Sequence, residues 1–298
     1  MTTINVLLAA LAALGIAFTI VQLRAAARAG QLKPTGESVL LGAVTNFFDT
    51  LGIGSFAPTT AWIKFRRLVP YSFIPATLNV GHAIPTVVQS AIYLTILGVH
   101  VDPVLLASCI AAAVLGALVG APIVVRAPVR VVQGVVGIAL IIAATLYAMR
   151  NLDWMPAGGV ATSLPSIEMY TAVGAHFVLG ALMAFGIGLY APSLILLSLL
   201  GLDPKLAFPI MTSACAFLMP TTGFKFIKTD RINLSIIMGI AIGGIPAVLV
   251  AAFIVKEMPV VWLRWGVVVV VLYAAILLLR SAFSPAAEPA AQKNSQAA

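Results

Sequence analysis

The sequence predicts an all-α polytopic membrane protein made of two four-element repeats with broken helices, preceded by one N-terminal transmembrane helix. Hydrophobic residues make up 61% of the 298 residues, charged residues only 9%, and the mean hydropathy is +1.10. Soluble domains carry about 25% charged residues, so this chain could not cover a water-exposed surface. The apolar runs are continuous and lack the two-residue alternation of barrel strands, which favours helices.

The repeat is visible as a duplicated motif. Residues 52–58 read Gly-Ile-Gly-Ser-Phe-Ala-Pro, and residues 186–192, 134 positions later, read Gly-Ile-Gly-Leu-Tyr-Ala-Pro. The same offset carries Pro70 onto Pro204 and Pro75 onto Pro209. Duplicated apolar segments that are interrupted by Gly and Pro in corresponding places are typical of transporters whose binding site lies between two repeats. We therefore expect repeats over 38–150 and 172–281.

The individual elements follow from the apolar runs, since a membrane helix needs about 20 apolar residues. The first helix lies within 1–30; no basic residue precedes it, so it is expected to be retained rather than cleaved as a signal peptide. Segment 151–171 is expected to be a linker that does not cross, and 282–298 a disordered tail. The expected elements are 4–23, 38–62, 70–97, 103–125, 129–149, 171–200, 205–227, 232–255 and 259–280.

Loop charges bear on the topology. The basic residues that give the net charge of +8 sit in short loops: Arg24, Arg28 and Lys33; Lys64, Arg66 and Arg67; Arg126 and Arg130; Lys225, Lys228 and Arg231. Basic loops face the cytoplasm, and this pattern rather than nucleic-acid binding explains the charge. If 38–62 and 171–200 are re-entrant hairpins, every strongly basic loop lies on one side and the repeats are inverted. Full crossing of both segments remains the alternative.

The breaks predict where a ligand would bind, because non-helical backbone in hydrocarbon survives where it lines a cavity or is buried in protein. The polar groups there are hydroxyls, amides and glycine N–H groups, and half-helix N-termini favour anions. The segments therefore predict a site for a small, oxygen-rich anion. The expected substrate-binding residues are Asn46, Gly52, Gly54, Ser55, Thr77, Asn79, Gly186, Gly188, Thr212 and Ser213.

Two titratable residues are candidates for coupling transport to a proton or another ion. Asp49 is the one acid inside an expected membrane element away from its ends, and such acids are costly and usually functional. His82 lies in the first broken segment. A structural ion pair for Asp49 and a packed neutral histidine remain the alternatives. His100 and His176 lie near the ends of expected elements and are interpreted as interfacial.

Three motifs carry a resemblance to a known family. They are the Gly-rich break with its proline in each half, the elements Pro75-Ala-Thr-Leu-Asn79 and Pro209-Ile-Met-Thr-Ser213, and the basic loop Lys225–Arg231. Over most of 38–281 the chain resembles the sulfite exporter TauE/SafE family, also called the toluene-sulfonate uptake permease or DUF81 group. The resemblance implies a bacterial inner-membrane, multi-pass transporter that exports or imports sulfite, a sulfonate or a related small organic anion.

Other function classes are weaker on the same residues. An intramembrane enzyme acting on a lipid-linked phosphate would need clustered acids, arginines or an activated nucleophile, and only Asp49, His82 and Ser55 could form such a cluster. An anion channel or a non-transporting scaffold subunit is also open. Cys109 and Cys215 form no disulfide or metal pattern, so no catalytic residue, metal or cofactor is expected. The expected partners are the anion and the lipid bilayer, with a homo-oligomer possible.

The re-entrant arrangement predicts that Lys64 and Lys205 lie on opposite sides of the membrane. A single cysteine at position 205 should react with an impermeant maleimide added from outside, whereas one at position 64 should react only after the membrane is opened. Equal labelling of both positions in intact cells would contradict this topology.

Overall fold

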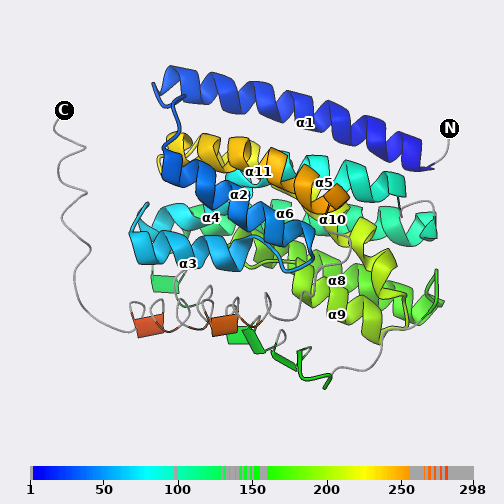
Figure 1. Ribbon diagram of the computed structural model, residues 1–298. Coiled ribbons are helices and arrows are strands. Elements are labelled where there is room, and N and C mark those ends of the chain that lie inside the picture. The colour runs from blue at the N-terminus through cyan, green and yellow to red at the C-terminus, as the bar shows by residue number, and fades with distance from the viewer. Residues whose placement is uncertain are drawn as a thin grey trace.

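The computed structural model describes residues 3–96, 100–128, 151–154 and 160–254, with scattered positions between 130 and 149 and between 265 and 280. Within these residues the chain is helical and forms no strand (Figure 1). Five of the described helices are long and apolar enough to cross a membrane: α1 (Thr3–Arg28), α6 (Pro103–Arg126), α8 (Ser166–Ala184), α10 (Pro204–Phe226) and α11 (Leu234–Ile254). The protein is therefore a multi-pass membrane protein. The expected elements 129–149 and 259–280 and the tail 282–298 lie largely or wholly outside the described residues.

The two elements after α1 are interrupted. The expected element 38–62 is two helices, α2 (Gly36–Thr50) and α3 (Phe56–Arg66), with a turn between them. The expected element 70–97 is interrupted, as expected for the broken segment that holds His82. It comprises a short 3₁₀-helix (Tyr71–Phe73), α4 (Ile74–Gly81) and α5 (Ala83–Ile96), with the helix interrupted at His82.

The second half differs from expectation in one place. The segment expected as 171–200 begins earlier, with α8 at Ser166, and it divides at the expected break into α8 and α9 (Tyr190–Leu199). The expected element 205–227 is α10, which runs through Pro209 and Pro220 without a break. Helices in membranes tolerate proline where neighbouring elements compensate the lost backbone bond, and α10 is packed against α5, α6 and α9.

The duplicated Gly-Ile-Gly motif ends α2 and α8 with the same set of backbone hydrogen bonds. In the first turn, Gly52 N–H donates to the Asp49 carbonyl (2.9 Å) and Ile53 N–H to the Phe48 carbonyl (3.1 Å). In the second, Gly186 N–H donates to Met183 (2.9 Å) and Ile187 N–H to Leu182 (3.3 Å). This is the Schellman cap, which needs a left-handed residue at its glycine.

The left-handed residue is present in both caps. Gly52 has φ 81° and Gly186 has φ 92°. The first glycine of each motif therefore has a structural reason to be glycine, and its N–H group is already engaged.

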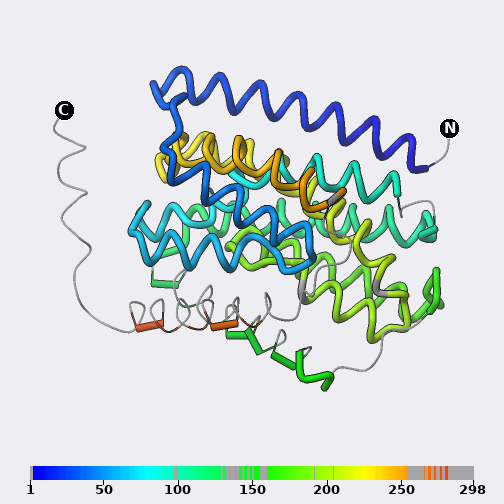
Figure 2. The backbone as a smooth tube through the Cα atoms, in the orientation of Figure 1, coloured from blue at the N-terminus to red at the C-terminus, as the bar shows by residue number. Residues whose placement is uncertain are grey.

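Each turn makes a hairpin, and the two hairpins open towards opposite ends of the helix bundle. The outer ends of α2 and α3 are joined by a salt bridge from Arg66 Nε to Glu37 Oε1 (2.7 Å). The outer ends of α8 and α9 meet at Ala161, which bonds to Gly201 (3.2 Å) and Asp203 (2.9 Å). Figure 2 shows the chain reversing at each turn.

One end of the bundle carries the basic loops. The loop after α1 contacts the start of α11, through Ser235 Oγ to the Lys33 carbonyl (2.7 Å) and Leu234 N–H to Gln31 Oε1 (2.8 Å). Arg231 Nη1 reaches the Ala127 carbonyl at the end of α6 (3.4 Å). The α2–α3 hairpin opens at this basic end, since α2 begins directly after the loop that holds Lys33.

Glycines allow the backbones of α2 and α11, and those of α6 and α8, to lie in direct contact. A Cβ atom on Gly42 would lie 2.3 Å from the Ile240 carbonyl oxygen, and one on Gly180 would lie 2.0 Å from the Ala113 carbonyl oxygen. A Cβ on Gly116 would lie 1.8 Å from the carbonyl oxygen of Phe177. Small residues allow such backbone contact between membrane helices. The first helix of each hairpin thus packs on a long helix from the other half of the chain.

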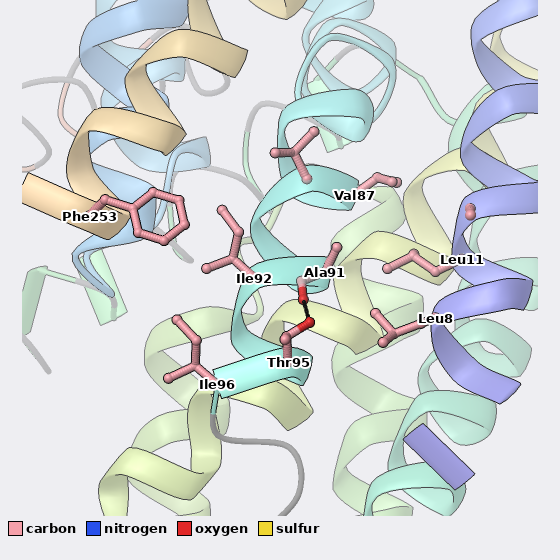
Figure 3. Close-up of a pocket in the computed structure, with 10 residues that line it drawn as sticks. Leu8, Leu11, Val87, Ala91, Ile92, Thr95, Ile96 and Phe253 are labelled. Carbon is pink, nitrogen blue, oxygen red and sulfur yellow. Dashed lines mark hydrogen bonds between the residues drawn. The ribbon is translucent and has the colours of Figure 1, made fainter. Parts of the chain in front are cut away.

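An apolar groove lies between α1 and α5 and reaches Phe253 of α11 (Figure 3), with a volume of about 530 Å³. Its lining includes Leu11, Val87 and Ile92, and the hydroxyl of Thr95 is engaged with the Ala91 carbonyl (2.7 Å). The groove presents no polar group that is free to bind an anion, so the candidate site lies elsewhere.

Gly116→Ala is predicted to destabilise the fold by about 1–3 kcal/mol, since overpacking forces the helices apart. The matched control is Gly174→Ala on the exposed side of α8, where an added Cβ meets nothing within 4 Å. That control should be neutral or stabilising, because alanine is the better helix former. Thermal unfolding in detergent measures both, and equal midpoints for the two variants would contradict the packing.

Candidate functional site

The tips of the two hairpins meet inside the bundle. α3 begins at Phe56 and α9 begins at Tyr190, and both residues are buried. A Cβ on Gly188, in the second turn, would lie 3.6 Å from Phe56 Cβ. Two helix N-termini from the two halves of the chain are therefore neighbours, and both direct unpaired backbone N–H groups towards the junction.

The start of α3 is occupied by a carboxylate from its own hairpin. Asp49 Oδ1 accepts the N–H of Ser55, the residue before α3, at 2.5 Å. The position 134 residues after Asp49 is Met183, which is buried and uncharged. Leu189 precedes α9, and its side chain does not cap that helix. The two helix starts therefore share a backbone pattern and differ in charge.

Side-chain amides from the first half fasten both turns. Gln89 Nε2 on α5 donates to the Asp49 carbonyl (3.3 Å), and Asn79 Nδ2 on α4 donates to the Met183 carbonyl (3.1 Å). These two carbonyls are the equivalent acceptors of the two Schellman caps. α4 and α5 thus contact the tip of each hairpin, which brings the expected residue Asn79 to the junction.

Several buried polar atoms at this junction are left without a partner among the described residues. They include Asp49 Oδ2, Gln89 Oε1, Tyr190 Oη, Asn79 Oδ1 and Thr77 Oγ1. The side chains of Tyr190 and Gln89 lie beside the Asp49 carboxylate. Buried polar atoms normally have partners, so an unfilled set of this size marks a place for a ligand, a proton or water.

His82 joins the expected residue Asn46 to α3. Its Nδ1 lies 3.0 Å from Asn46 Oδ1, and its Nε2 lies 2.9 Å from Thr59 Oγ1. Because Asn46 Nδ2 donates to the Gly42 carbonyl (2.8 Å), its Oδ1 is the acceptor. The hydrogen of the neutral ring is therefore on Nδ1, and Thr59 donates to Nε2.

A second histidine makes the same kind of contact in the other hairpin. His176 was expected at an interface, and that interpretation was wrong, because α8 begins at Ser166 and leaves His176 fully buried in mid-helix. Its Nδ1 lies 2.8 Å from the Ala172 carbonyl and its Nε2 lies 3.0 Å from Ser193 Oγ. Ser193 follows Thr59 by 134 positions.

The remaining expected residues lie at different places. Gly54 lies in the first turn with φ 90°. Thr212 donates its hydroxyl to the Phe208 carbonyl of its own helix (2.6 Å). Ser213 is hydrogen-bonded to Ser90 on α5 (2.9 Å), a partner that no sequence pattern indicated. Neither α10 hydroxyl is bonded to the hairpin tips.

The described residues contain no cluster of three His, Cys, Asp or Glu side chains that could hold a metal ion. Cys109 and Cys215 are buried free thiols. At the basic end, outside the buried region, hydrogen bonds from Arg66 and Trp62 to the Glu37 carboxylate lower the pKa of Glu37. Asp49 and Lys64 are the charged residues in the described part of the chain whose side chains are buried.

The apolar helices define a multi-pass membrane protein, and two of its hairpins meet at a buried junction. Residues 169–298 match the model of the family described as Sulfite exporter TauE/SafE. This match covers less than half of the chain and confirms the resemblance to that family over these residues. No curated protein and no solved structure matches the chain.

Ser193→Ala is predicted to lower stability by about 1–3 kcal/mol, because it leaves His176 Nε2 buried without a donor. The control is Ser198→Ala on the same helix, whose hydroxyl donates only to the Leu194 carbonyl within α9 (2.6 Å). Thermal unfolding of the purified variants should separate them. A Ser193→Ala midpoint equal to that of Ser198→Ala would show that the pair contributes nothing.

Proposed function

We propose that the protein is a secondary transporter of the bacterial inner membrane that moves sulfite, a sulfonate or a related small organic anion. The observation that carries the proposal is the meeting of the α3 and α9 N-termini at a buried junction. Helix N-termini bind anions through free N–H groups and the positive end of the helix dipole. The TauE/SafE match over 169–298 supports the same substrate class.

The anion is proposed to bind at the start of α9. At the start of α3, the Asp49 carboxylate already takes the Ser55 N–H, whereas Met183 at the equivalent position leaves the start of α9 without a resident negative charge. Asn79 and Thr77 supply further polar groups, since each keeps one buried oxygen without a partner among the described residues. The Asn79 amide, now on the Met183 carbonyl, would turn its N–H groups to the anion.

We propose that the two repeats are inverted and that one moves against the other during transport. The two hairpins open at opposite ends of the bundle, and each packs on a long helix of the other half. The corresponding caps at Gly52 and Gly186 support a common origin of the two hairpins. The positive-inside rule then places the basic end in the cytoplasm.

Asp49 and His82 are proposed to couple transport to an ion. They lie on adjoining parts of one network, because His82 is bonded to Asn46, one turn before Asp49 on α2. A carboxylate at the anion junction opposes anion binding by Coulomb repulsion. Neutralising Asp49 would remove that opposition.

The enzyme alternative is not favoured by the geometry. His82 is hydrogen-bonded to Thr59 and Asn46, and Asp49 is bonded to the backbone of Ser55. An activated nucleophile needs a side-chain hydroxyl paired with its base. The Ser55 hydroxyl lies beside Asp49, but His82 is bonded to Thr59 and Asn46 instead, so the three residues do not form a nucleophile with its base and an orienting group.

Asn79→Ala is predicted to reduce anion flux in proteoliposomes by about tenfold, because a hydrogen bond to a charged ligand is worth about 1.5–3 kcal/mol. The anions to test are sulfite, methanesulfonate, sulfoacetate, sulfate and acetate. Thr212→Ala, whose hydroxyl is occupied within α10, should reduce flux less than Asn79→Ala.

Thr171→Ala on the exposed face of α8 is the control for expression and reconstitution. Unchanged flux in both Asn79→Ala and Thr212→Ala would reject the site. Absence of saturable flux of every anion by the wild-type protein would reject the function.

A further inference from the structure

We propose that Asp49, Gln89 and Tyr190 form a binding site for one transported proton, and that Tyr190 links this site to the anion site on α9. The inference rests on the proposed function and adds to it the chemical identity of the coupled ion and two residues beyond Asp49. The three side chains come from α2, α5 and α9, so the proton site joins both halves of the protein.

The geometry is a set of buried oxygens that face one carboxylate. Asp49 is 3% exposed, Gln89 0% and Tyr190 5%. Both neighbours lie beside the Asp49 carboxylate, and Asp49 Oδ2, Gln89 Oε1 and Tyr190 Oη have no hydrogen-bond partner among the described residues. The other atoms of Asp49 and Gln89 are engaged: Oδ1 accepts from Ser55 N–H and Nε2 donates to the Asp49 carbonyl.

One proton on Asp49 supplies the hydrogen-bond donor that these oxygens lack. The carboxylate Oδ2 and the amide Oε1 accept hydrogen bonds and do not donate them, and the Tyr190 hydroxyl beside Asp49 has one hydrogen to donate. One of the two oxygens therefore stays without a donor while Asp49 is ionised. Protonation of Asp49 at Oδ2 creates an O–H donor that can bond to Gln89 Oε1 or Tyr190 Oη, while Oδ1 keeps the Ser55 N–H. The same event removes a negative charge from a site shielded from water, where an uncompensated charge is expensive.

Binding of the proton then strengthens binding of the anion, and binding of the anion strengthens binding of the proton. Tyr190 is the first residue of α9, so its backbone lies at the proposed anion site and its side chain lies beside Asp49. An anion at the start of α9 repels an ionised Asp49 and is compatible with a neutral one. Anion and proton would therefore cross together, with no net charge for a monovalent anion.

The other titratable groups around Asp49 fit a single proton site. Tyr93 on α5 and Cys215 on α10 face it. The Tyr93 hydroxyl donates to the Thr50 carbonyl (2.6 Å), and the Cys215 thiol lies 3.6 Å from Met183 Sδ. His82 is reached only through Asn46. Asp49 is the acid among these groups.

Asp49→Asn separates binding from coupling. Asparagine can keep the Ser55 N–H on its carbonyl oxygen and present an N–H donor to Gln89 and Tyr190, which imitates the protonated acid. In proteoliposomes with methanesulfonate or sulfite, this variant should exchange the anion at equal pH at least as fast as wild type, because the charge that opposes the anion is gone. It should lose at least tenfold in uptake driven by a pH gradient, and an internal pyranine dye should record no proton movement.

Tyr190→Phe removes the unpartnered hydroxyl and should reduce gradient-driven uptake several-fold while exchange persists. Tyr170→Phe, on an exposed tyrosine of α8, is the matched control and should equal wild type in both assays. If Asp49→Asn impairs folding or exchange, the Tyr190→Phe ratio of driven uptake to exchange still decides the question.

Three results would overturn the inference while leaving the transporter in place. They are wild-type anion flux without proton movement, wild-type flux driven by a sodium gradient instead, or unchanged driven uptake in both Asp49→Asn and Tyr190→Phe. Wild-type protein that shows neither exchange nor driven uptake of any tested anion would instead refute the proposed function itself.

Discussion

The structure depends on one constraint: a chain that reverses direction inside the apolar interior of a membrane protein must satisfy its own peptide groups, because apolar surroundings offer them no partner. Both reversals meet this constraint with the same Schellman cap, built on Gly52 and Gly186. The capped turns are then fastened by the amides of Gln89 and Asn79, which bond to the equivalent carbonyls of Asp49 and Met183. Without these closures the hairpin tips could not stay buried, and the starts of α3 and α9 could not face each other.

Close approach of backbone groups also explains the glycines at the helix contacts. Carbonyl oxygens of α11 and α8 approach the backbone of α2 and α6 so closely that a Cβ atom would have to occupy their position, as at Gly42 and Gly116. The contact between α2 and α11 and that between α6 and α8 join opposite halves of the chain. In the proposed mechanism, a displacement of one half would therefore also move the hairpin of the other half that packs on it.

The sequence predicted what local chemistry determines and missed what tertiary contacts determine. The repeated Gly-Ile-Gly motif located both turns, and continuous apolar runs gave α6, α10 and α11 within a few residues of their observed ends. The helix interruption at His82 agrees with the expected broken segment. The path of α10 through Pro209 and Pro220 agrees with the expected element 205–227, although only surrounding helices decide whether a proline breaks a helix. His176 was placed at an interface because its depth depends on where α8 begins. The pairing of His82 with Asn46 and Thr59 joins residues 36 and 23 positions apart, which no periodicity encodes.

In the proposed mechanism, the difference between Asp49 and Met183 makes the two helix starts unequal in charge. Two helix starts with the same backbone geometry would attract an anion equally, and a symmetrical site would have no reason to distinguish its halves. A carboxylate in one hairpin compensates the positive end of α3, while the thioether in the other leaves the positive end of α9 uncompensated. In the proposed mechanism, the anion therefore binds on one repeat and the proton on the other. Tyr190 has its backbone at the start of α9 and its hydroxyl beside Asp49. In this mechanism it therefore couples binding of the anion to binding of the proton.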